Sequence, residues 1–468
     1  DAQDYEHIDP HYGKIVNDGG ELVDSEAEDN LKATKYIIRT TDKENLEASD
    51  RFFADFVETA HQKGIKIILD GVFNHCGSFH KWLDKESIYK NAKGYPKGAF
   101  HGVDSPYRNF FRFHEDTDSY DGWWGHSTMP KLFYENSEKL VNEILAIARK
   151  WISPPYNVDG WRLDVAADLG HSEDFNHRFW SKFRKEVKKI NPDVIILAEH
   201  YGDPYSWLNG KEWDTVMNYD AFMEPVSFFL TGMEKHSEAF YPEKVGDGKL
   251  FWHTLLYAKA RMPMPSYMCS MNELSNHDHS RFLTRTNKKV GRLHTMGSKA
   301  AEEGIDESVF RQAVIMQISM QGAPTVYYGD EVGVCGWTDP DNRRTFPWGN
   351  ENWDILEFHK YAISLHKRYR SLCHGSLVPI LGEHNLIAYI RSVKDEQMLI
   401  VIYTGSEEIE VDIPVWLMGL KNKDKLVRVM LTEKDSYNVG ELSIEVKGSS
   451  TKLKLKKNTA AMYLAKSQ

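Results

Sequence analysis

The sequence predicts an α/β protein: a (β/α)8 TIM barrel, with a loop domain inserted after its third strand and a C-terminal antiparallel β-sandwich domain. Three observations support this prediction. Short apolar runs that end in polar residues alternate with segments of helical periodicity. A long aromatic-rich stretch, 76–135, interrupts the alternation. After about residue 374 the pattern changes to short apolar runs separated by turns, which is typical of antiparallel strands.

The predicted parallel strands are apolar runs, several of which end in an acid or an amide. They lie at 64–70, 158–165, 194–198, 215–218, 268–274 and 325–328. Apolar residues at helical spacing predict helices at 52–60, 172–190, 310–320 and 354–372, with Ser49 as a candidate cap of the first. The C-terminal runs lie at 386–391, 398–404, 408–413, 426–431 and 442–446. The polar stretch 11–48 has no clear pattern.

Composition limits the classes of partner. The 468 residues carry a formal net charge of −11, which disfavours nucleic acid or an anionic membrane as the main partner. Aromatic residues make up 12% of the chain, and the flat faces of Tyr and Trp suit neutral sugar rings, although a large core also buries many aromatics. Four scattered cysteines without a CxxC pair favour free thiols; they leave the compartment open, with a lean towards the cytoplasm. No apolar run is long enough to predict a membrane span.

Polar residues gather where the predicted strands end. Asp70 is followed by Asn74 and His75, and three further strand ends carry Arg162 with Asp164, Glu199 with His200, and His277 with Asp278. Because the carboxyl ends of barrel strands converge on one face, these side chains are candidates for one site. A single acid at a strand end is usually a cap or a turn residue, but several acids at successive ends favour a catalytic site.

These strand ends carry a resemblance to a known family. The stretches 70–75 (DGVFNH), 160–166 (GWRLDVA), 197–200 (LAEH) and 275–278 (SNHD) resemble, in order, the four signatures of the α-amylase family, glycoside hydrolase family 13. By this resemblance Asp164 is the nucleophile, Glu199 the general acid/base and Asp278 the stabiliser of the transition state. The resemblance also implies that Arg162, His75 and His277 hold the nucleophile and the sugar, and that Asp70 is a structural acid beside them.

Further motifs extend the resemblance. Asp339 and Arg343, in 338–343 (TDPDNR), resemble donor-side sugar contacts, with a solvated surface ion pair as the alternative. The stretch 129–132 (MPKL) resembles a loop signature of the neopullulanase, cyclomaltodextrinase and maltogenic amylase branch. Asp168 replaces a His that is common in calcium-dependent relatives, so neither calcium nor any other cofactor is predicted from this position. His200 is either an acceptor-side residue or a structural histidine.

The start of the chain resembles the family segment that follows the second barrel strand. We therefore expect residues 1–373 to form a barrel that lacks its first two strands, with 374–468 as the C-terminal domain. The same reasoning predicts that the chain is part of a longer polypeptide. In this branch an upstream β domain often builds a homodimer.

The resemblance implies a retaining hydrolase of α-1,4 and perhaps α-1,6 glucosidic bonds in maltodextrin, starch, pullulan or cyclodextrin. One alternative is transglycosylation, in which a sugar instead of water accepts the covalent intermediate. Another is a non-catalytic sugar-binding protein on the same fold, since fold alone does not give function. The joint presence of Asp164, Glu199 and Asp278 argues against this last alternative.

Overall fold

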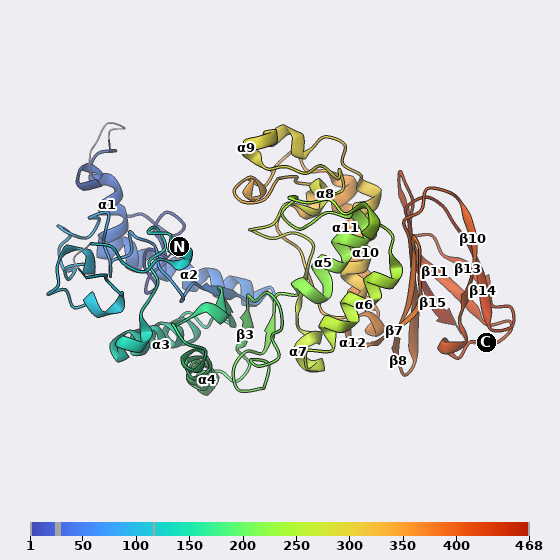
Figure 1. Cartoon of the computed structure of the whole chain (residues 1–468), viewed down its shortest axis with the longest axis horizontal. Coiled ribbons are helices and arrows are strands. Elements are labelled where there is room, and N and C mark those ends of the chain that lie inside the picture. Colours follow the sequence, from blue (N-terminus) through green and yellow to red (C-terminus); the bar gives the residue numbers. More distant parts are fainter. Residues whose placement is uncertain (1, 24–29, 116–117, 467–468) are drawn as a thin grey trace. The chain divides into compact units, whose positions relative to one another are not determined.

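The computed structural model describes residues 2–23, 30–115 and 118–466 (Figure 1). The chain forms two compact units. The first comprises Asp1–His200 and Ser206–Val216, and the second comprises Tyr201–Tyr205 and Met217–Gln468. The domain boundary predicted between residues 373 and 374 falls inside the second unit and stays a prediction. Among the described residues, no helix is both long enough and apolar enough to cross a membrane.

The first unit is built on a sheet of four parallel strands in the order β1-β2-β3-β4. Its strands are β1 (Ile68–Gly71), β2 (Gly160–Leu163), β3 (Ile195–Ala198) and β4 (Thr215–Val216). Its helices are α1 (Thr34–Thr41), α2 (Lys43–Gln62), α3 (Glu138–Ile152) and α4 (Glu173–Ile190). The predicted strands in this unit are confirmed, each shorter than its apolar run, and the helix predicted at 172–190 is confirmed with Ser172 as its cap.

Helix α2 corrects one prediction. Ser49 is not its N-terminal cap, because the helix begins earlier, at Lys43. The cap is Asp42, whose side chain accepts hydrogen bonds from the backbone N–H groups of Glu44 and Asn45. Ser49 lies inside the helix, where its hydroxyl donates to the Asn45 carbonyl oxygen at 2.8 Å.

The inserted stretch 76–135 is largely irregular, as predicted. Its described residues form the short helices η2 (Ala99–His101), η3 (Arg108–Phe110), η4 (Trp123–Gly125) and η5 (Tyr134–Asn136). Aromatic contacts hold it together, such as the edge-to-face pair of Trp82 and Phe110 with ring centroids 5.0 Å apart. Most of its aromatic residues therefore pack the insert itself.

A buried histidine in this insert predicts a loss of stability in acid. Nδ1 of His80 accepts the backbone N–H of Trp82 at 3.0 Å, so the ring has to be neutral, and burial holds its pKa well below the usual 6.5. Below about pH 6.5 this histidine is therefore protonated in the unfolded state but stays neutral in the native state. We expect His80 to contribute up to about 1.4 kcal/mol of destabilisation per pH unit between pH 6 and 5.

Urea unfolding at pH 7, 6 and 5 measures this effect. His80→Asn keeps an acceptor near Nδ1 but does not titrate, so its stability should fall less steeply on acidification. His11→Asn, at a surface histidine that pairs with Asp9, is the matched control. An unchanged slope in His80→Asn would contradict the prediction.

The second unit contains a parallel pair of strands, β5 (Met271–Glu273) and β6 (Ala323–Thr325). Its helices are α5 (Glu224–Thr231), α6 (Gly248–Lys259), α7 (Met264–Met268), α8 (Phe282–Arg285), α9 (Leu293–Met296), α10 (Glu307–Ser319), α11 (Trp353–Arg368) and α12 (Arg370–His374). The strand predicted at 325–328 is shifted towards the N-terminus, because the ladder with β5 uses residues 323–325. The helix predicted at 354–372 is two helices, separated at Tyr369, whose backbone is extended.

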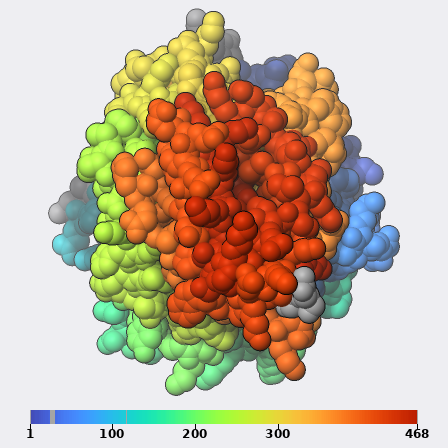
Figure 2. All heavy atoms as spheres, turned by 90° about the vertical axis from the view of Figure 1, so that its right-hand side faces the viewer, coloured from blue at the N-terminus to red at the C-terminus, as the bar shows by residue number. Residues whose placement is uncertain are grey.

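The C-terminal part of this unit consists mainly of antiparallel strands, whose residues occupy the middle of the view in Figure 2. They are β7 (Ser376–Glu383), β8 (Leu386–Val393), β9 (Glu396–Tyr403), β10 (Ile409–Pro414), β11 (Lys425–Thr432), β12 (Tyr437–Asn438), β13 (Leu442–Glu445), β14 (Ser450–Leu455) and β15 (Thr459–Lys466). Strands β10 and β14 form a small sheet of their own. One face of β8 and β9 joins the helical core through Ile387 and Ile400, and the other packs with β10 and β14 through Ile390 and Val401.

Candidate active site

The register of the first sheet aligns the predicted residues of three strands. Asp70 on β1 stands beside Arg162 on β2, and Gly71, Leu163 and Ala198 form the next level. Asp164 and Glu199 follow directly, with the backbone N–H of Glu199 donating to the Leu163 carbonyl at 2.9 Å. Three neighbouring strands therefore deliver acids at their carboxyl ends, as the sequence predicted.

Arg162 connects all three acids. Its Nη1 lies 2.8 Å from Oδ1 of Asp70 and 2.8 Å from Oδ1 of Asp164, and its Nη2 lies 2.8 Å from Oε2 of Glu199. Burial would lower the pKa of this guanidinium, but the attraction of Asp70, Glu199 and Asp164 outweighs burial and raises the pKa. The site therefore combines one permanent cation with three carboxylates.

Val165, the residue after Asp164, has a strained backbone and contacts Glu199. Val165 has φ 36° and ψ 49°, in the left-handed region that a β-branched residue rarely adopts. Its N–H donates to Oε2 of Glu199 at 3.2 Å, so this oxygen accepts from both Arg162 and Val165. Glu199 is only 3% exposed. This hydrogen bond links the backbone next to Asp164 to the carboxyl group of Glu199.

His75 is buried beside a tryptophan of the insert. The rings of His75 and Trp123 are stacked, with centroids 5.1 Å apart and planes within 3°. Burial lowers the pKa of His75, so the ring is neutral near pH 7. In the sequence Trp123 is one of many aromatic residues in the stretch 76–135, and this irregular stretch has no periodicity from which the contact follows.

The insert is anchored here by hydrogen bonds. Nε1 of Trp123 donates to Asp168 at 2.9 Å, and Nζ of Lys131 donates to the Asp168 carbonyl oxygen at 2.9 Å. The stretch 129–132 pairs with the loop after β1, through the N–H of Cys76 to Pro130 and the N–H of Leu132 to Asn74. The stretch 129–132 thus holds the insert next to His75 by hydrogen bonds, and Asp168 orients Trp123.

His200 has aromatic surroundings in the first unit. Its ring centroid lies 5.0 Å from Trp207 and 5.8 Å from Trp213, and these two tryptophans stack at 4.7 Å. This packing supports a structural role, while the acceptor-side role stays a prediction.

The second unit gathers the remaining predicted residues around Arg343. Its Nε lies 2.9 Å from Oδ1 of Asp339 and donates to the His277 carbonyl oxygen at 3.0 Å, and its Nη2 lies 3.7 Å from Oδ1 of Asp278. Nε2 of His277 is 3.6 Å from the same Asp278 oxygen. The side chains of all four residues are between about a third and a half exposed, so they are accessible to a ligand.

Parallel strands that alternate with helices and carry acids at their carboxyl ends define a protein of the α/β class. Comparison with known proteins gives the family. Residues 48–352, more than half of the chain, match the family model of the alpha-amylase catalytic domain. The chain belongs to the α-amylase family of glycoside hydrolases, whose catalytic domain is a TIM barrel, which confirms the predicted fold class.

Relatives support the predicted branch. The chain is 35% identical over 368 residues to neopullulanase 2 of Thermoactinomyces vulgaris, covering 78% of this chain and 55% of that protein. It is 29% identical over 435 residues to a cyclomaltodextrinase of Geobacillus thermopakistaniensis, covering 90% and 60%. The debranching enzyme of Nostoc punctiforme is similar in structure, with a TM-score of 0.69, 25% identity and coverage of 90% and 80%. The chain spans little more than half the length of the first two relatives.

Proposed function

We propose that this chain is the catalytic part of a retaining α-glucan hydrolase that cleaves α-1,4 and, in some substrates, α-1,6 glucosidic bonds. The observation that carries the proposal is the contact of Asp70, Asp164 and Glu199 with the single guanidinium of Arg162. Two nitrogens of one guanidinium hold Asp164 and Glu199, which keeps the two carboxyl groups close, as a retaining mechanism requires. The names of the relatives, neopullulanase and cyclomaltodextrinase, support pullulan and cyclodextrin as substrates beside maltodextrin and starch.

In the proposed reaction a carboxylate oxygen of Asp164 attacks the anomeric carbon while protonated Glu199 gives its proton to the leaving oxygen. The glycosidic bond breaks, and a glycosyl ester forms on Asp164. Glu199, now a carboxylate, takes a proton from water, and the water oxygen attacks the anomeric carbon and releases Asp164. Arg162 keeps Asp164 in the charged, nucleophilic form. The scheme uses carboxylates and water, and we include no cofactor in it.

We propose supporting roles for the other residues. Asp278 places negative charge near the oxocarbenium-like centre. Asp70, His75 and His277 orient the nucleophile and the sugar at the point of cleavage. Asp339 and Arg343 bind the sugar on the donor side, and His200 is either an acceptor-side residue or a structural residue that packs against Trp207 and Trp213.

Product release tests the proposal. The protein is incubated with maltodextrin, pullulan and cyclodextrin, the products are sized, and the anomer first released is read by NMR. We expect α-anomers, the retained configuration. Products longer than the substrate would instead favour transglycosylation, and no release from any α-glucan would favour a non-catalytic sugar-binding protein.

Replacing Trp123 is expected to lower kcat/KM. Trp123→Ala removes the ring stacked on His75 and the donor to Asp168, so His75 loses its orientation. We expect kcat/KM on maltotriose to fall about tenfold or more, in the range of about 1–3 kcal/mol for a lost hydrogen bond and ring contact. Trp124→Ala is the matched control, because that neighbouring ring is 80% exposed. An equal loss in both variants would show that the contact with His75 is not the cause.

A further inference from the structure

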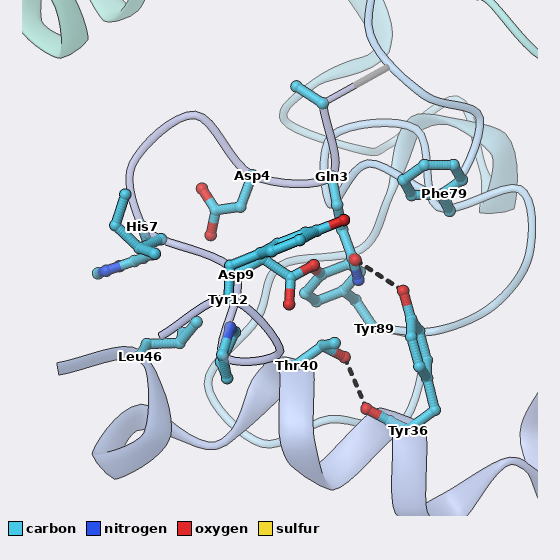
Figure 3. Close-up of a pocket in the computed structure, with 13 residues that line it drawn as sticks. Gln3, Asp4, His7, Asp9, Tyr12, Tyr36, Thr40, Leu46, Phe79 and Tyr89 are labelled. Atoms are coloured by element: carbon cyan, nitrogen blue, oxygen red, sulfur yellow. Dashed lines mark hydrogen bonds between the residues drawn. The ribbon is translucent and has the colours of Figure 1, made fainter. Parts of the chain in front are cut away.

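A pocket of the first unit lies apart from the strand-end residues. It has a volume of about 350 Å³ and is lined by the segment 2–12, helix α1, the start of α2 and two aromatic residues of the insert (Figure 3). Segment 2–12 and helix α1 precede residue 48, where the match to the family model begins. Most of the wall is therefore built by residues that precede the part of the chain matched by the family model.

The acidic and histidine side chains that line the pocket each pair with a residue of the opposite kind, an acid with a base. The pairs are Asp4 with Lys81 at 2.8 Å, Asp9 with His11 at 2.8 Å, and His7 with Asp50 at 2.9 Å. Because these ionisable groups already have partners, the lining offers an incoming ion no free countercharge, which disfavours a charged ligand. A neutral ligand fits this lining.

The remaining groups favour a ligand rich in hydroxyls. Oε1 of Gln3 accepts from the hydroxyl of Tyr36 at 2.7 Å, whereas Nε2 of Gln3 is buried and has no hydrogen-bond partner among the described residues. Tyr12 is 86% exposed, and Figure 3 shows its ring extending over the pocket towards Gln3. A flat ring beside an unused amide donor matches a sugar ring, which has an apolar face and a hydroxyl edge.

We propose that this pocket is a second sugar site, which binds a glucosyl unit of an α-glucan away from the residues that cut it. Tyr12 stacks on the sugar ring, and Nε2 of Gln3 donates to a sugar hydroxyl. The choice of an α-glucan rests on the proposed function, whereas the need for a neutral, hydroxyl-rich ligand rests on the pocket alone. Such a site holds a glucan chain while another part of it is cleaved.

Hydrogen exchange with maltotriose tests the site directly. An Asp164→Asn background prevents consumption of the sugar. We expect maltotriose to protect the amides of 2–12 and 34–41, and Tyr12→Ala and Gln3→Ala each to raise the Kd read from this protection at least tenfold. Tyr12→Ala alters only an exposed side chain, so its folding is not at risk. Tyr257→Ala, at a tyrosine that is 58% exposed in the second unit, is the matched control and should leave the Kd unchanged.

Several outcomes would overturn the proposal. These are no protection of the two segments at saturating maltotriose, or an unchanged Kd in both Tyr12→Ala and Gln3→Ala. Equal protection by cellotriose would overturn the assignment to α-glucans. The result is separable from the proposed function. Protection without product release from any glucan would support the second sugar site and contradict the hydrolase function. Product release without protection would support the hydrolase function and contradict the second sugar site.

Discussion

Replacing Asp164 by Asn is expected to lower kcat on maltodextrin by at least about 10⁴-fold, because an amide cannot form the glycosyl ester. The change preserves the shape of the side chain at the end of β2, so the fold should persist. Rates are measured by release of reducing sugar and folding by circular dichroism. Asp168→Asn, four residues further on, is the matched control: Asp168 contacts Trp123 and Lys131, and its rate should fall far less.

Chemical rescue separates a nucleophile from a structural acid. In Asp164→Ala the missing side chain leaves room for azide, which attacks the anomeric carbon from the vacated side while Glu199 protonates the leaving oxygen. The expected product is a glycosyl azide of inverted configuration, detected by NMR. Azide cannot take over the function of a purely structural acid. If Asp164→Ala kept its rate and azide gave no glycosyl azide, Asp164 would not be the nucleophile.

Much of this site could be predicted because strand ends are readable from sequence. An apolar run followed by an acid marks a parallel strand, and the carboxyl ends of such strands meet. The shared contact of Asp70, Asp164 and Glu199 with Arg162 follows from that rule. The stacking of Trp123 on His75 does not, because it depends on how an irregular insert folds back, and no periodicity encodes that path.

The errors in the fold have local causes. The late start of the regular apolar spacing suggests Ser49 as the cap of α2. The helix begins earlier than this spacing because its first turns are polar and contact the chain that precedes them. Asn45, for example, accepts the backbone N–H groups of Val16 and Asn17. Strand β14 lies outside the predicted apolar runs because its residues alternate, with Leu453 and Leu455 buried and the lysines next to them exposed.

Loss of Arg162 should affect stability as well as activity. Arg162→Met leaves the carboxylate of Asp164, whose side chain is only 17% exposed, without its cation, and removes the partner of Asp70 and Glu199. Removing one partner of a buried ion pair costs about 3–5 kcal/mol, so we expect a fall of this size in the free energy of unfolding. Urea unfolding measures it. Arg184→Met, which removes a guanidinium that pairs with Asp214, should cost about 1 kcal/mol.

A double variant identifies the source of that loss. If mutual repulsion of the carboxylates destabilises Arg162→Met, then adding Asp164→Asn removes the charge of the nucleophile and should restore part of the stability. If the loss came only from missing packing of the guanidinium, Asp164→Asn would add its own cost and the two effects would sum. Recovery would show that the same charge balance both holds the strand ends together and keeps Asp164 charged for attack. A simple sum would separate these two roles of Arg162.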